Sequence, residues 1–115
     1  AKVIAIREIT LKPGSEPDFE RFVVEECYPA WRDFPTGWEL SVLKGDRGDR
    51  FGSYIHVIEF ASVEARNRHL AGPDQPASEE IQRVMRSQEA VTKKWNELAS
   101  PIHPTVYTDY VDIGK

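Results

Sequence analysis

The alternation of apolar and polar residues predicts four β-strands along the chain. The clearest covers residues 52–60 (GSYIHVIEF), in which Tyr54, His56 and Ile58 share one face and the intervening residues share the other. Both faces carry large apolar side chains, which is typical of a central strand that is covered on two sides. Three further strands are predicted over residues 3–11, 38–43 and 105–113.

Apolar residues at helical spacing predict a first helix between the first two strands. Ser15 is expected to serve as its N-cap, with Asp18 three residues later in an approximate capping box. Pro29 lacks the backbone N–H that a helix interior needs. We therefore expect it to kink the helix or to restart it near Tyr28.

Two more helices are predicted between the third and fourth strands. Ser62 is expected to cap a short helix over residues 63–70, and Ser78 a longer helix whose apolar stripe extends to Leu98. The order of elements is therefore β-α-β-β-α-α-β. With the first and third strands at the centre of a four-stranded antiparallel sheet, this order gives a ferredoxin-like α+β fold.

Right-handed crossovers place the helices of such a fold on one face of the sheet. The other face would then be bare, yet both central strands carry apolar residues on each of their faces. An uncovered apolar face of that size is more than monomers usually expose. We therefore expect a homodimer in which a second copy packs sheet against sheet. Because both faces are apolar, the sequence leaves open which of them forms the interface.

Composition indicates a single domain spanning residues 1–115, with 40% hydrophobic and 30% charged residues. The net charge of −4 and a pI near 5.4 argue against nucleic acid or an anionic membrane as a partner. The single cysteine, Cys27, excludes an internal disulfide and is typical of a reducing compartment. No apolar run approaches the ~20 residues that span a bilayer, and the N-terminus lacks the layout of a signal peptide. We therefore expect a cytoplasmic protein.

Three passages resemble a known family, the dimeric α+β barrel proteins. They are ITLKPGSEPDFERF (residues 9–22), EECYPAWRDFPTGWELSVLKGDRG (25–48) and YIHVIEFASVEARNRH (54–69). Together they resemble that family's strand and turn, its proline-containing helix end, its hairpin and the helix start that follows. The family includes antibiotic-biosynthesis monooxygenases, polyketide cyclases, muconolactone isomerase-like enzymes, haem-degrading monooxygenases and stress-responsive barrels.

The resemblance implies a small-molecule enzyme of the cofactor-independent monooxygenase or cyclase kind, acting on an aromatic or polyketide-like substrate. Two alternatives remain open: a non-catalytic ligand-binding or stress-related barrel, and a haem-binding or haem-degrading barrel. The haem-degrading branch typically uses a polar residue of the first strand, a tryptophan and a helix histidine. The counterparts here would be Arg7 or Glu8, one of the tryptophans, and His69.

His56 is the first candidate catalytic residue, because its pKa of ordinarily about 6.5 suits a general base or acid. Tyr54 shares its face of the strand and is the second candidate. In the oxygenase version, His56 takes a proton from a phenol or enol, and the resulting carbanion reacts with O₂. The alternative is a core histidine whose ring bonds a backbone carbonyl or a tyrosine hydroxyl.

Several aromatic residues are candidates to line a pocket for a small hydrophobic or aromatic ligand, although each more commonly belongs to the core. Tyr107 and Tyr110 lie on opposite faces of the last predicted strand, so only one can face the pocket, and Asp109 shares the face of Tyr107. His103 lies between two prolines and is expected to be a loop residue. The candidate substrate-binding residues are Phe22, Tyr28, Trp31, Trp38, Trp95 and His69.

No metal site and no resident cofactor are expected. The three histidines lack metal-ligand spacing such as His-x3-His. The glycines of residues 44–52 (KGDRGDRFG) do not form a phosphate-binding loop, because the required lysine and strand-loop-helix context are missing. This segment is instead predicted to be the turn of a β-hairpin.

Overall fold

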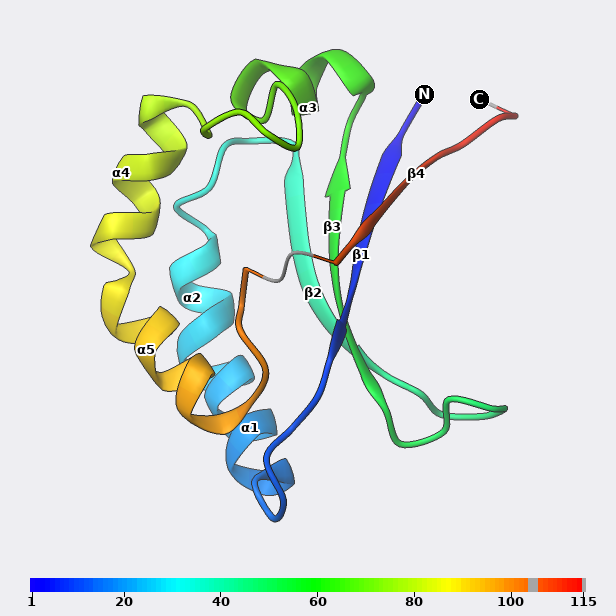
Figure 1. Cartoon of the computed structure of the whole chain (residues 1–115), viewed down its shortest axis with the longest axis vertical. Helices are drawn as coiled ribbons and strands as arrows, with labels where there is room; N and C mark the ends of the chain where they lie inside the picture. The colour runs from blue at the N-terminus through cyan, green and yellow to red at the C-terminus, as the bar shows by residue number, and fades with distance from the viewer. Residues whose placement is uncertain (104–105, 115) are drawn as a thin grey trace.

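The computed structural model describes residues 1–103 and 106–114, which form a four-stranded antiparallel sheet with helices on one face (Figure 1). The order of strands across the sheet is β2-β3-β1-β4, with β1 and β3 at the centre. The predicted ferredoxin-like α+β fold is thus confirmed, while Thr105, the predicted start of the last strand, lies outside the described residues. The strands are β1 (Val3–Ile9), β2 (Trp38–Lys44), β3 (Tyr54–Phe60) and β4 (Thr108–Val111).

The register of the central strands decides which side chains meet beneath the helices. On the helix-covered face, Ala5 of β1 lies opposite Ile58 of β3, and Arg7 lies opposite His56. Residues paired in this way point to the same side of an antiparallel sheet. Arg7 and His56 therefore lie among the apolar residues that β1 and β3 turn toward the helices, as the alternation around His56 predicts for that residue.

The first helical segment changes its winding along its length. It starts as α1 (Glu16–Phe22), continues as a π-helical turn, η1 (Val23–Cys27), and ends as α2 (Tyr28–Trp31). Pro29 stands in the first turn of α2, directly after the π-helical turn, so its missing N–H falls where the winding of the helix changes. The restart predicted near Tyr28 is confirmed.

The remaining helices cover the same face of the sheet (Figure 1). None of the helices in the described ranges has the length and apolar character needed to cross a membrane. Their bounds are α3 (Val63–His69), α4 (Glu79–Ser87) and α5 (Glu89–Leu98).

Two of the three predicted serine caps are confirmed. The hydroxyl oxygens of Ser62 and Ser78 accept hydrogen bonds from backbone N–H groups three residues later, at 3.0 and 3.3 Å. Ser15 stands at the predicted N-cap position of α1, but its side chain makes no capping hydrogen bond. Its hydroxyl lies 2.7 and 2.9 Å from the carbonyl oxygens of Lys12 and Leu98, so it joins the start of α1 to the end of α5.

The single long helix predicted after Ser78 is divided into α4 and α5 at Gln88. The Gln88 side chain is buried, and its Nε2 donates a hydrogen bond of 2.6 Å to the carbonyl oxygen of Ala30. These two residues lie 58 positions apart in the sequence. The periodicity of the segment alone therefore carried no sign of the break.

The core lies between the sheet and the helix layer. Phe19 of α1 and Trp95 of α5 pack edge to face there, with ring centroids 5.1 Å apart. Cys27 is buried in the same cluster, and burial raises the pKa of its thiol to about 12. It is therefore an inert core residue, as its place in the apolar stripe predicts.

The opposite face of the sheet carries no helix among the described residues (Figure 1). At its centre Ile6 of β1 lies opposite Val57 of β3. At its edges the side chains of Leu43 and Tyr110 are 49% and 55% exposed. We call this surface the helix-free sheet face, and its apolar residues are Ile4, Ile6, Leu43, Ile55, Val57 and Tyr110.

Candidate functional site

A cleft of about 650 Å³ lies between the helix-covered face of the sheet and the helices. The sheet side is formed by residues of β1, β2, β3 and β4, and the helix side by α2, α3, α4, α5 and the loops that follow α3 and α5. Three of the predicted site residues line it, namely Trp31, Trp38 and His56. Apolar side chains such as Leu40 and Phe60 make up much of the remaining lining.

His56 lies in this cleft between two tryptophans. Its ring stacks on Trp31 at a centroid distance of 4.9 Å and lies against Trp95 at 5.6 Å. The side chain is 4% exposed, and within the described residues neither ring nitrogen has a hydrogen-bond partner. The bonds to a carbonyl or a tyrosine hydroxyl that a core histidine would make are thus not formed there. Because an unpaired buried polar atom is costly, both nitrogens favour a partner that enters the cleft.

The surroundings of His56 keep its ring uncharged at neutral pH. Burial, and then the positive charges of Arg7 and His103, lower its pKa from 6.5 to about 3. A neutral imidazole has one nitrogen that donates a hydrogen bond and one that accepts. His56 can therefore accept a proton from an acidic ligand, whereas it cannot donate one as a general acid in this state.

The polar end of the cleft, beside β1 and β4, contains two guanidinium groups and one carboxylate. Arg66 of α3 bonds the carboxylate of Asp109 at 2.7 Å. The guanidinium carbon of Arg7 lies 5.5 Å from the centre of the Tyr107 ring. Burial lowers the pKa of Arg7, while Asp109 and Tyr107 oppose that effect. The guanidinium nevertheless stays charged in any working buffer.

The last segment of the chain contributes to the same end of the cleft. Tyr107 and Asp109 both line the cleft, so the face that they share in the sequence pattern is the one that faces it. His103 is a loop residue, as predicted, and also lines the cleft at an exposed position. Partial desolvation, followed by the charge of Arg7, lowers its pKa.

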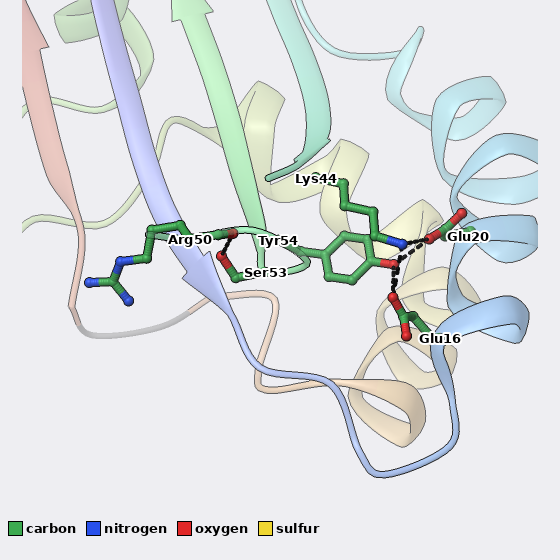
Figure 2. A network of polar contacts seen from close by, with 6 residues as sticks. All are labelled: Glu16, Glu20, Lys44, Arg50, Ser53 and Tyr54. Carbon is green, nitrogen blue, oxygen red and sulfur yellow. Dashed lines mark hydrogen bonds and ion pairs between the residues drawn. The ribbon is translucent and has the colours of Figure 1, made fainter. Parts of the chain in front are cut away.

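Tyr54, the second candidate catalytic residue, lies outside the cleft lining, at the opposite end of β3 from Phe60. Its hydroxyl contacts the carboxylates of Glu16 at 3.0 Å and of Glu20, and Lys44 pairs with both at 2.9 and 3.2 Å (Figure 2). Lys44 lowers the pKa of Glu16, and Tyr54 lowers that of Glu20. Burial, together with Glu20, raises the pKa of Tyr54. This network joins β3 to α1 and is not directed at the cleft.

Three of the predicted aromatic residues support the cleft from behind its lining. Trp95 packs under His56, and its Nε1 donates a hydrogen bond of 2.9 Å to the carbonyl oxygen of Ser100. The hydroxyl of Tyr28 accepts a hydrogen bond from the backbone of β2 at 3.1 Å. Phe22 is 2% exposed in the core.

His69 also lies outside the cleft lining, at the junction of α3 and α4. Its Nδ1 is 2.7 Å from the hydroxyl oxygen of Ser78, and its ring stands edge-on to Trp38 at 6.0 Å. His69, the counterpart of the helix histidine in the haem-degrading branch, is thus engaged in packing and hydrogen bonding. Within the described ranges, no group of three or more His, Cys, Asp or Glu side chains is placed to bind a metal ion.

Sequence reasoning found only part of the charged end of the cleft, because it considered Tyr107 and Asp109 but not their basic neighbours. It did not single out Arg66 or Gln88, and it considered Arg7 only as a counterpart in the haem branch. The alternation could have pointed to Arg7, because Arg7 lies on the same face of β1 as Ala5 and Ile9, which are buried. No such signal marked Arg66, whose carboxylate partner lies 43 positions away in the sequence.

Comparisons with known proteins agree with this fold. No family model and no curated protein matches the chain. A solved structure from Bordetella bronchiseptica, of a protein named as an antibiotic biosynthesis monooxygenase, has a TM-score of 0.60 at 18% identity over 97% of each chain. A NIPSNAP-like domain protein from Burkholderia xenovorans has a TM-score of 0.57 at 13% identity, over 95% of this chain and 81% of that one.

HapK from Hahella chejuensis is similar as well, with a TM-score of 0.56 at 15% identity over 100% of this chain and 95% of its own. The chain therefore has the small α+β fold, with a four-stranded antiparallel sheet, of antibiotic biosynthesis monooxygenase-like proteins. At these identities the similarity establishes the fold. Any statement about chemistry has to come from the residues of the cleft.

Proposed function

We propose that this protein is a small-molecule enzyme of the cofactor-independent monooxygenase or cyclase kind, acting on an aromatic or polyketide-like substrate. The observation that carries the proposal is a single buried imidazole: His56 lines an apolar cleft, and neither of its nitrogens is bonded within the described residues. Buried polar atoms are normally paired, so an unpaired one in a cleft is a candidate for substrate contact. The fold shared with a protein named as an antibiotic biosynthesis monooxygenase supports the proposal.

In the oxygenase form of this proposal, His56 is the base and the aromatic walls hold the substrate. His56 removes a proton from a phenol or enol, and the resulting carbanion reacts with O₂. For a ring methylene group the reaction balances: the carbon becomes a carbonyl, one oxygen atom enters the product and the other leaves as water. Trp31 and Trp38 exclude bulk water from the reacting atoms and orient the rings.

The competing function is a non-catalytic barrel that binds a hydrophobic ligand or stabilises an assembly. That function predicts a cleft filled by Trp and Phe side chains and a His56 whose ring is bonded within the protein. The open volume of about 650 Å³ and the unpaired ring support the enzyme instead.

Oxygen uptake with a panel of polycyclic phenols and enolisable ring ketones tests the proposed base. We expect His56→Ala to lower kcat by about 10²- to 10⁴-fold, the usual contribution of general base catalysis. Arg50→Gln, a variant on the exposed hairpin outside the cleft lining, is the control and should retain activity. Unchanged turnover in His56→Ala would show that another group is the base, and no turnover by the wild type across the panel would count against the oxygenase.

We also propose that the protein forms a homodimer through the helix-free sheet face. Ile6 and Val57 form the apolar centre of that face, and the partly exposed Leu43 and Tyr110 extend it to the sheet edges. An apolar surface of this extent is characteristic of an interface. A two-fold axis lets one such face pair with its copy.

A further inference from the structure

Arg7 is the one charged side chain that β1 places on the helix-covered face of the sheet. Its partner in the register is His56, so the guanidinium and imidazole groups come from adjacent strands and point to the same side. Both side chains line the cleft. Any ligand that reaches the nitrogens of His56 therefore meets the guanidinium of Arg7 next to it.

The positive charge of Arg7 is only partly offset by a neighbouring negative charge, that of Asp109. Asp109 is the only carboxylate that the described residues contribute to the cleft lining, and it is bonded to Arg66 at 2.7 Å. Within residues 1–103 and 106–114, Arg7 itself makes no ion pair and no hydrogen bond, and Tyr107 offers it only a ring face. Two guanidinium groups thus share one carboxylate, which leaves a net charge of about +1 at this end of the cleft.

We propose that Arg7 binds an oxyanion of the ligand, and that the cleft selects apolar ring systems carrying a carboxylate over their neutral counterparts. This inference rests on the proposed function, because it assigns a class of ligand to the same cleft. A planar guanidinium is suited to the task, since it donates two parallel hydrogen bonds to a pair of oxygens and keeps its charge. Trp31 and Trp38 remain free to contact the rings.

An oxyanion at Arg7 would also act on His56. The charge of Arg7 disfavours the protonated imidazole, and a bound anion offsets that charge. The pKa of His56 then rises, and its ring becomes a stronger base while an acidic ligand is present. Arg7 is in this view a binding residue that also prepares the base.

The test is a pair of probes that differ only in charge, 2-naphthoate and 2-naphthamide, titrated by NMR into the ¹⁵N-labelled protein at pH 7.5. We expect the carboxylate to bind about 10- to 100-fold more tightly, the usual gain from hydrogen bonds to a charged group. Arg7→Gln should bring the ratio of the two dissociation constants close to one. Arg7→Lys, which keeps the charge, should retain part of the preference.

Arg50→Gln is the matched control, because Arg50 lies on the exposed hairpin, pairs with Glu8 at 3.5 Å and is absent from the cleft lining. It should leave the ratio unchanged. Equal affinity of the two probes for the wild type, or an unchanged ratio in Arg7→Gln, overturns the inference about Arg7 and leaves the aromatic-ligand cleft standing. If neither probe binds at all, both the inference about Arg7 and the aromatic-ligand cleft are overturned.

Discussion

At the scale of single residues, the chain fixes the orientation of His56 by packing alone. Trp31 and Trp95 hold the ring from two sides, at centroid distances of 4.9 and 5.6 Å, so its plane is set without hydrogen bonds. A ring that is held in this way needs no hydrogen bond to the rest of the described protein at either nitrogen. The cost is an unpaired polar group in the interior, which a ligand bonded to the ring, as proposed above, would remove.

The first prediction concerns the protonation of His56. We expect its imidazole to remain neutral down to acidic pH, with a pKa near 3, because burial and then Arg7 and His103 disfavour the charged ring. Arg7→Gln should raise this pKa but leave it below 6.5, since burial is the larger cause. Imidazole ¹H–¹⁵N correlation spectra recorded over a pH series measure both values.

Arg50→Gln should leave the titration of His56 unchanged. A wild-type ring that titrates near 6.5 would contradict the described surroundings of His56. The charged and titratable groups that line the same cleft are Arg7, Arg66, His103, Tyr107 and Asp109.

At the scale of elements, the strands could be predicted because burial on alternate faces leaves a period of two in the sequence. Strands expected over 38–43 and 52–60 are found at Trp38–Lys44 and Tyr54–Phe60. The break at Gln88 could not be predicted in this way, because the carbonyl that pairs with it comes from a distant turn of another helix. Local periodicity reports burial, whereas a helix break depends on a tertiary partner.

The same contrast explains how much of the candidate site could be predicted. Its aromatic part follows from composition and strand parity, which placed Trp31, Trp38 and His56 in the cleft. Its charged end comes from β1, α3 and β4, and these elements meet only once the register of the sheet is set. No spacing in the sequence brings Arg66 and Asp109 together.

The element-scale prediction concerns the network that joins β3 to α1 (Figure 2). Tyr54→Phe removes the hydroxyl that bonds Glu16 and Glu20, and should lower the free energy of unfolding at pH 7 by about 1 kcal/mol. Both carboxylates have lowered pKa values in the folded state. The two carboxylates therefore contribute their full stabilisation of the fold when the pH is above their ordinary pKa of 4.5. This stabilisation is lost as the pH falls below that value.

Urea unfolding at pH 7 and at pH 3.5 measures this effect. The gap between wild type and Tyr54→Phe should narrow at the lower pH, because protonation of the carboxylates removes the same interactions. His56 adds an acid-dependent loss of stability to both proteins alike and cancels in the comparison. A gap of equal size at both pH values would show that the network does not act through ionised carboxylates.

At the scale of the whole molecule, the helices of the described residues lie on one side of the sheet (Figure 1). The other side has apolar residues such as Ile6 and Val57 at its centre. This asymmetry explains why β1 and β3 alternate between two apolar faces although only one of them meets a helix. The sequence pattern predicted that both faces are apolar but could not tell which of them meets the helices. In the described part of the chain the helix-free sheet face carries no helix, so it is the face on which the proposed homodimer would form.

The corresponding prediction is that Ile6→Asp gives a monomer where the wild type is a dimer. A charge at the centre of the helix-free sheet face would be buried without a partner on association, which costs several kcal/mol. Val24→Asp is the matched control, since Val24 is 63% exposed on the helix layer. Analytical ultracentrifugation at micromolar concentration measures the oligomeric state of both variants, and Val24→Asp should remain a dimer. A wild-type protein that sediments as a monomer contradicts the proposed dimer.

The distribution of the tryptophans has a practical consequence for finding the substrate. All three tryptophans of the chain lie at the cleft, two in its lining and one directly beneath His56. Indole fluorescence from the unlabelled wild-type protein is therefore a reporter of this one region, with no background from elsewhere in the chain. Compound libraries can be ranked by quenching of that emission before any product has been identified.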